Sequence, residues 1–148
     1  MQQFNESGYL AVIEKPIKID KYSLRKIVPF NHATILTYKY VYDKLKGYTV
    51  SDRTSRCEDY DLWFRFFHAG FNGANMKEPL YFVREDMAAL KRRTFKARWN
   101  GFKTTVYGFK LLGFPKRWLI IEFFKMILKS IIPSNVMLFY RSLNRRTK

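Results

Sequence analysis

The sequence predicts a mixed α/β or α+β unit with a basic helical annex at its C-terminal end. Three observations support this fold class. Short β-prone runs alternate with helix-like segments over residues 1–86, an aromatic-rich helical pattern follows a cluster of acids near residue 58, and the remaining residues are basic and apolar. With 148 residues, 47% hydrophobic and 18% aromatic, the chain suits one globular domain of modest size.

The first part of the chain carries two predicted strands and two helical segments. Residues 8–15 (GYLAVIEK) read as a strand, and residues 18–30 as a polar connector or a short helix that ends before Pro29. Residues 31–38 (NHATILTY) are rich in β-prone side chains and also predict a strand. The segment KYVYDKLKGY then predicts a short helix that Gly47 closes.

Further along, helices dominate. A helix is expected between a Ser55 cap and Gly70, followed by two short strands over residues 71–76 and 80–85. A long basic helix over about 87–110 ends at a Gly-Phe-Pro break, and an apolar helix over 118–132 ends at Pro133. We expect no signal peptide and no membrane-spanning helix, because no segment offers about 20 uninterrupted apolar residues. The single cysteine, Cys57, excludes an internal disulfide.

Charge divides the chain into two predicted parts. Residues 1–86 hold 13 Lys/Arg and 11 Asp/Glu, a net charge of +2. Residues 87–148 hold 15 Lys/Arg and one acid, Glu122, a net charge of +14. A surface this basic implies an anionic partner such as phosphate, nucleic acid or an acidic membrane.

Three acids open the predicted helix of residues 55–70, and two of them have ordinary structural explanations. Ser55 and Glu58 match the S-x-x-E capping box, in which the glutamate bonds back to the cap amide. Asp61 stands four residues before Arg65, which predicts an exposed ion pair on the helix surface. Asp59 and Asp61 cannot share one metal ion as a D-x-D pair, because their side chains lie about 200° apart on a helix.

Asp59 is the candidate for chemistry. At about 100° per residue, it falls in the middle of the apolar arc that contains Leu62, Trp63 and Phe66, whereas Asp61 lies on the opposite side. A carboxylate that faces the interior must be hydrogen-bonded, be paired with a cation or face a cleft. Asp59 is therefore either a buried aspartate held by loop amides or a carboxylate placed for reaction.

The segment SRCEDYDLWFRFFHAGFNGANMKEPLYFVRE resembles the acid-Asp segment of family 2 glycosyltransferases, which are inverting GT-A enzymes of bacterial surface and capsule polysaccharide synthesis. NHATILTYKYVYDKLKGY is similar to the upstream N-H-P-T and G-G-Y stretch of that family. The basic and apolar residues after 87 are similar to the tails of capsule-type members. The resemblance implies that residues 1–86 are the acceptor-side, C-terminal half of a GT-A domain, and that 87–148 are a tail.

In that family the Asp of the acidic pair is the general base, and Asp59 matches it. The resemblance implies transfer of a sugar from a nucleotide-sugar donor to a saccharide or lipid-linked acceptor, with Glu58, Asn31 and His32 binding substrate. A structural role for His32 is the alternative. Members of the family hold Mg²⁺ or Mn²⁺ through a D-x-D in a preceding nucleotide-binding half. No such half is recognisable in this sequence, so the chain is expected to be a fragment that is inactive alone.

The basic C-terminal part predicts a peripheral location on the inner, cytoplasmic face of a bacterial membrane. In residues 118–132, Glu122, Lys125 and Lys129 form one polar stripe on an apolar helix, and the face of Trp118, Leu119, Phe123 and Ile127 is expected to enter an anionic bilayer. The alternative is a helix packed within the enzyme. Lys91, Arg92 and Arg93 are predicted to meet lipid phosphates or a lipid-diphosphate acceptor, or else to be solvated surface charge.

Two rival functions remain open from the sequence. Basic residues interleave with Trp99, Phe102, Tyr107 and Phe109, which is one pattern of a nucleic-acid-binding module. No recognisable nucleic-acid-binding motif accompanies it. The other rival is a non-catalytic, basic membrane-binding scaffold.

Overall fold

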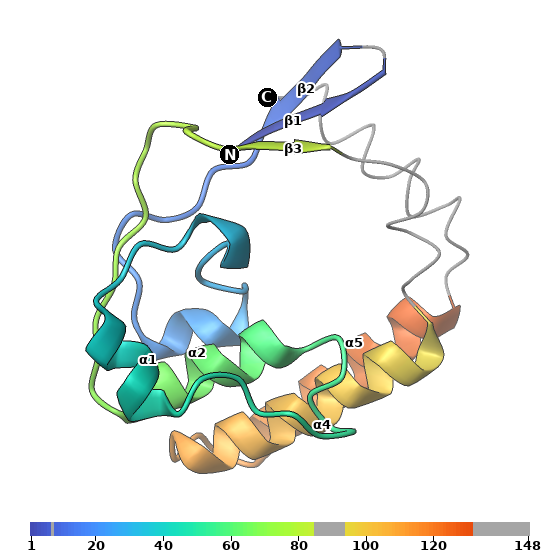
Figure 1. Cartoon of the computed structure of the whole chain (residues 1–148). Coiled ribbons are helices and arrows are strands. Elements are labelled where there is room, and N and C mark those ends of the chain that lie inside the picture. The colour runs from blue at the N-terminus through green and yellow to red at the C-terminus, as the bar shows by residue number, and fades with distance from the viewer. Residues whose placement is uncertain (7, 85–93, 132–148) are drawn as a thin grey trace.

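The computed structural model describes residues 1–6, 8–84 and 94–131. Its elements, in chain order, are β1 (Gln2–Asn5), β2 (Gly8–Val12), the 3₁₀ helices η1 (Lys21–Arg25) and η2 (His32–Thr34), α1 (Lys39–Leu45), α2 (Glu58–His68), β3 (Phe82–Arg84), α4 (Phe95–Leu111) and α5 (Arg117–Ile131). Figure 1 shows a small sheet at one end of the molecule and the pair α4–α5 at the other. The mixed α/β class is therefore confirmed.

The sheet has three strands in the order β2-β1-β3. β1 runs antiparallel to β2, with Phe4 opposite Tyr9, and parallel to β3, with Gln2 opposite Phe82. Gly8 follows the hairpin turn with a φ of 111°, a conformation that costs glycine little. The strands predicted over 8–15 and 80–85 are thus present in shortened form.

Two of the predicted strands are wrong. In the segment 31–38, His32–Thr34 form one turn of 3₁₀ helix, and Thr34 bonds back to the Asn31 carbonyl through both its amide and its hydroxyl. In the segment 71–76, Ala74 makes a single isolated bridge with Lys18. β-Prone side chains favour an extended backbone, but a strand also needs a neighbouring edge, and neither segment lies along one in the described residues.

Helix α1 ends where glycine predicted it. Lys46 and Gly47 both take left-handed backbone conformations, with φ of 57° and 64°, and the Gly47 amide bonds to the Tyr42 carbonyl. This arrangement is a common helix C-terminus. It leads the chain into the loop of residues 46–57, which connects α1 to α2.

Helix α2 is the centre of the hydrophobic core. On one side, Phe30 meets Trp63 and Phe66 edge to face, with ring centroids 5.0 and 5.9 Å apart. On another side, Phe64 is fully buried against α4, where its ring lies 6.1 Å from that of Phe109. The core therefore contains residues from both predicted parts of the chain. The boundary near residue 86 falls at the segment 85–93, outside the described residues, and stays a prediction.

Helices α4 and α5 form an antiparallel pair along one side of the molecule (Figure 1). α4 begins at Thr94, whose hydroxyl accepts a hydrogen bond from the Ala97 amide, and it ends before Gly113, whose φ is 70°. The predicted break at Gly-Phe-Pro is confirmed, and so is the apolar helix that follows it. Residues 87–93 of the predicted basic helix lie outside the described residues.

Candidate functional site

The capping box predicted at Ser55 is wrong, because α2 starts later. The residue before the helix is Cys57, and Ser55 is exposed. The Glu58 carboxylate does bond back to the backbone, but to the Arg56 amide at 3.0 Å. Arg56 has a φ of 69°, so the chain reverses direction here before the helix begins. Glu58 itself is exposed at the first helical position.

Asp61 is buried, and the predicted exposed position is wrong. Its side chain is 0% exposed and contacts three others: Arg53 at 2.7 Å, Arg65 at 2.8 Å and the Thr49 hydroxyl at 2.8 Å. The predicted pair with Arg65 exists, but it is part of a buried network rather than a surface pair. Burial by itself would raise the pKa of Asp61, but contacts from Arg53, Thr49 and Arg65 outweigh it and lower the pKa below the ordinary 3.8.

This network fastens the loop of residues 46–57 to helix α2. Arg65 also donates to the carbonyls of Leu45 and Gly47, at the end of α1. The Arg53 guanidinium lies 4.1 Å from the ring centre of Tyr107 on α4, a cation–π contact. The helical periodicity placed Asp61 opposite Asp59 correctly. That opposite side is buried because the loop and α4 cover it.

Asp59, the predicted general base, is partly buried in the first turn of α2. Its Oδ1 accepts a hydrogen bond from the Tyr60 amide at 2.8 Å. Its charge acts on two neighbours. The pKa of Tyr48 is raised mainly by burial, then by the contact with Tyr42, and to a smaller extent by the Asp59 charge. The pKa of Cys57 is raised to about 11, mainly by burial and next by the Asp59 charge. The charge of Asp59 is therefore close enough to Tyr48 and Cys57 to act on both.

His32 belongs to the same neighbourhood through Tyr48. Its Nδ1 lies 2.8 Å from the Tyr48 hydroxyl, which is 3.5 Å from the Tyr42 hydroxyl. His32 thus contacts a tyrosine on which the charge of Asp59 also acts. Tyr48 was not among the predicted substrate-binding residues, because its spacing of 11 residues from Asp59 matches no pattern that would connect the two. Lys91, Arg92 and Arg93 lie outside the described residues.

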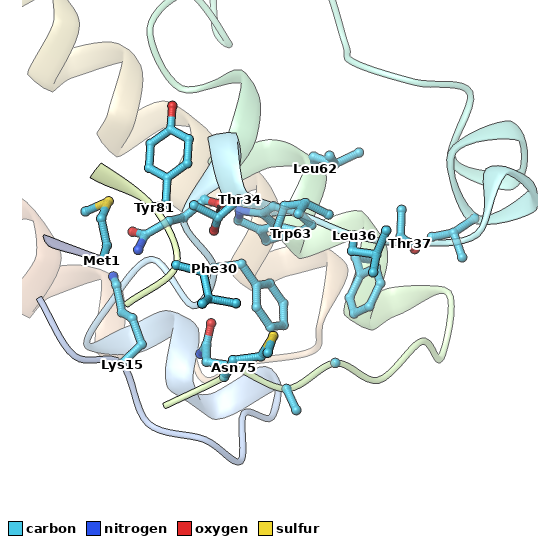
Figure 2. A pocket seen from close by; sticks show the side chains of 18 of the residues that line it. Met1, Lys15, Phe30, Thr34, Leu36, Thr37, Leu62, Trp63, Asn75 and Tyr81 are labelled. Carbon is cyan, nitrogen blue, oxygen red and sulfur yellow. Dashed lines mark hydrogen bonds between the residues drawn. The ribbon is translucent and has the colours of Figure 1, made fainter. Parts of the chain in front are cut away.

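A cavity of about 540 Å³ is lined by Leu62, Trp63 and Phe66, on the face of α2 that also carries Asp59. Figure 2 shows Phe30 and Trp63 in its wall, with Lys15 and Asn75 further along. Asn31 also lines it, whereas Asp59, His32 and Glu58 do not. The Trp63 indole nitrogen is buried and has no hydrogen-bond partner among the described residues. The volume of the cavity is in the range of small-molecule pockets. Its lining residues are scattered between Met1 and Tyr81, so no sequence pattern connects them.

The metal implied by the family resemblance finds no ligand set in this part of the protein. Among residues 1–6, 8–84 and 94–131, no group of three or more His, Cys, Asp or Glu side chains could hold a metal ion. Asp61 is already paired with two arginines, and Glu58 is exposed. The described residues therefore do not fit a magnesium or manganese site.

The aromatic residues of α4 divide between packed and exposed positions. Phe109 is 1% exposed in the core, and Tyr107 has the Arg53 guanidinium at its ring. Phe102 contacts both Trp99 and Phe123. Trp99 and Tyr107 are each 40% exposed, so the nucleic-acid-binding alternative stays a prediction. Within the described chain, no helix has the length and apolar content to cross a bilayer.

Sequence comparison finds one informative relative. The chain is 45% identical over 95 residues, 64% of its length, to the protein named "Putative glycosyltransferase EpsE" of Bacillus subtilis (strain 168). The match covers 34% of that protein, so the chain spans about a third of its relative. No protein family model matches the sequence, and no solved structure matches it. The similarity agrees with the glycosyltransferase part of the family resemblance and does not extend to the inverting type or to family 2.

Proposed function

We propose that this chain is the acceptor-side part of an inverting, family 2 glycosyltransferase. The observation that carries the proposal is the 45% identity over 95 residues to a protein named as a glycosyltransferase. The reaction proposed is transfer of a sugar from a nucleotide-sugar donor to a growing bacterial surface polysaccharide or a lipid-linked acceptor. The match covers only a third of the relative. We therefore expect the nucleotide-binding half to correspond to the part of the relative that the match does not cover.

Asp59 is proposed as the general base. It would take the proton of the acceptor hydroxyl while the hydroxyl oxygen bonds to the anomeric carbon and the nucleoside diphosphate leaves with its electron pair. The contrast with Asp61 supports this choice. Asp61 is fully buried and paired with Arg53 and Arg65, which hold it ionised and unreachable for a hydroxyl. Asp59 is partly accessible.

The remaining predicted residues take binding roles in this proposal. Glu58 and His32 are exposed and would contact sugar hydroxyls, and Asn31 would bind substrate from the wall of the cavity. Lys91, Arg92 and Arg93 would contact the diphosphate of a lipid-linked acceptor. A divalent metal on the donor diphosphate is expected to be held by the nucleotide-binding half. This chain by itself is therefore expected to transfer no sugar.

The test uses a chimaera in which this chain replaces the matching segment of the relative. Release of nucleoside diphosphate is measured with a panel of nucleotide-sugars and a membrane extract as acceptor. Asp59→Asn should lower the rate at least about a hundredfold, as expected for loss of a general base, without changing the melting temperature.

Asp43→Asn is the matched control, because Asp43 is an exposed acid on α1 paired with Lys39. It should leave the rate unchanged. Transfer that survives Asp59→Asn in a chimaera that is otherwise active would show that the base lies elsewhere. A chimaera that folds and releases no nucleotide with any donor would count against the glycosyltransferase assignment.

A further inference from the structure

Helix α5 presents an apolar face to the outside of the described structure. Five large hydrophobic side chains fall within an arc of about 100° on this helix. They are Ile120, Ile121, Phe124, Leu128 and Ile131, and they are between 49% and 72% exposed. The opposite side of α5 faces the protein, with Met126 buried and Trp118 packed against the core. The structure thus separates a core face from an exposed apolar face.

The exposed face continues onto α4 through a series of aromatic rings. Phe123 lies 6.0 Å from Phe124 on its own helix and 5.5 Å from Phe102 on α4. Phe102 in turn lies 5.8 Å from Trp99, which is 40% exposed. We call this combined surface the α4–α5 apolar patch. Contiguous exposed apolar surface of this kind marks a site of contact with another apolar surface.

The border of the patch is positively charged. Residues 94–131 contain eight Lys/Arg and one acid, Glu122, which is paired with Lys125 at 2.8 Å. Lys116, Arg117 and Lys129 of the same region are exposed. Two copies of such a patch would repel each other, whereas an anionic surface would attract it. Charge complementarity therefore favours an anionic lipid bilayer as the occupant.

We propose that the α4–α5 apolar patch inserts into the interfacial layer of an anionic membrane, with α5 parallel to the bilayer. The 15 described residues of α5 form a helix about 22 Å long, which is shorter than about 30 Å of hydrocarbon and suited to lying in the surface plane. Trp99, which is 40% exposed at the α4 end of the patch, belongs to a residue type that is enriched at membrane interfaces. The face differs from the predicted one, because Trp118 and Leu119 point to the core and not to the lipid. The proposal does not depend on glycosyl transfer.

Vesicle co-sedimentation with the full chain tests the proposal. Vesicles of phosphatidylcholine with added phosphatidylglycerol should bind the protein, and vesicles of phosphatidylcholine alone should bind it much less. Part of the binding should survive high salt, because burial of apolar side chains is not screened. Leu128→Glu should lower the partition coefficient at high salt about tenfold or more. Val50→Glu is the matched control: Val50 is 97% exposed in the loop of residues 46–57, and its variant should bind like the wild type.

Quenching of tryptophan fluorescence by brominated phosphatidylglycerol adds a second readout. Trp99 should be quenched on binding, and the Trp99→Phe variant should lose most of that quenching, because Trp63 is 3% exposed in the core and Trp118 packs against the core. Complete loss of binding at high salt, or equal binding by Leu128→Glu, would overturn the proposal. So would a lipid-independent dimer, seen by analytical ultracentrifugation, that Leu128→Glu dissociates, since the patch would then be a contact between two copies.

Discussion

Helices α2 and α5 both carry many large apolar side chains, and α5 is the more apolar of the two, yet their environments are opposite. α2 buries Leu62, Trp63, Phe64 and Phe66 and even the carboxylate of Asp61. α5 leaves most of its large hydrophobic residues accessible and has only Met126 buried. The difference comes from their neighbours. α2 is covered by the Phe30 segment, by the 46–57 loop and by α4, whereas α5 rests on the remainder of the structure through one side.

The comparison shows that the apolar content of a helix predicts how much surface it could bury, and that tertiary neighbours decide how much it does bury. It also explains the buried Asp61. A helix with cover on several sides must satisfy its polar residues internally, and Arg53, Arg65 and Thr49 do so here. α5 needs no buried ion-pair partners, because its basic side chains are exposed to water.

The largest effect is expected at Asp61. Asp61→Ala should lower the free energy of unfolding by about 3–5 kcal/mol, because it leaves Arg53 and Arg65 without their buried counter-ion. The control is Asp43→Ala on α1, which breaks an exposed pair with Lys39 and should cost about 0–1 kcal/mol. Chemical denaturation of both variants gives the measurement. Equal, small losses would mean that α2 is exposed on its Asp61 side.

A pair of leucines compares the two helices directly. Leu62→Ala in α2 removes a side chain that is 1% exposed and should cost about 2–5 kcal/mol. Leu128→Ala in α5 removes one that is 60% exposed and should change stability by no more than about 0.5 kcal/mol. Thermal unfolding without lipid should separate the two variants. A large loss for Leu128→Ala would contradict an accessible face on α5.

A pair of glycines tests how tightly α4 closes on α2. A Cβ at Gly108 would lie within 2.2 Å of the Phe64 ring, so Gly108→Ala should cost about 1–3 kcal/mol by overpacking. A Cβ at Gly101, on the same helix, would meet only the Cys57 sulfur at 3.5 Å. Gly101→Ala should therefore stabilise the protein by about 0.5–1 kcal/mol, since alanine favours helix. The sign of the difference, read from denaturant midpoints, is the deciding observation.

The smallest effect is the acid dependence from Asp61. Its folded pKa lies below the ordinary 3.8, so its stabilising contribution is complete above the unfolded pKa and is lost as pH falls through the folded pKa. Stability should therefore decline below about pH 4 more steeply in the wild type than in Asp61→Asn. If the free energy of unfolding fell equally with pH in the wild type and in Asp61→Asn, Asp61 would not be ion-paired in the folded state.

Local patterns were sufficient for the helices and for part of the sheet. Gly47, Gly70 and Gly113 ended helices where expected, because their left-handed conformations are a local property of the chain. Strands were less predictable. Residues 31–38 and 71–76 have strand-like composition, but pairing depends on an edge that other segments must supply.

For the candidate site, periodicity placed Asp59 and Asp61 on opposite sides of α2 correctly. It could not say which side was covered. The contacts of Arg53 and Thr49 with Asp61 depend on a loop whose path no periodic pattern encodes. The same is true of Tyr48, whose hydroxyl contacts His32.

The sequence by itself determined the positions of the helices, the basic charge of the C-terminal part and the similarity to a glycosyltransferase. Helix formation depends on nearby residues, and charge and identity are properties of the residues themselves. Only the tertiary structure decided that Asp61 is buried, that Trp118 faces the core and that the outward side of α5 is apolar. Burial is a property of contacts between distant segments, so the same amphipathic pattern can end in a core or at a surface.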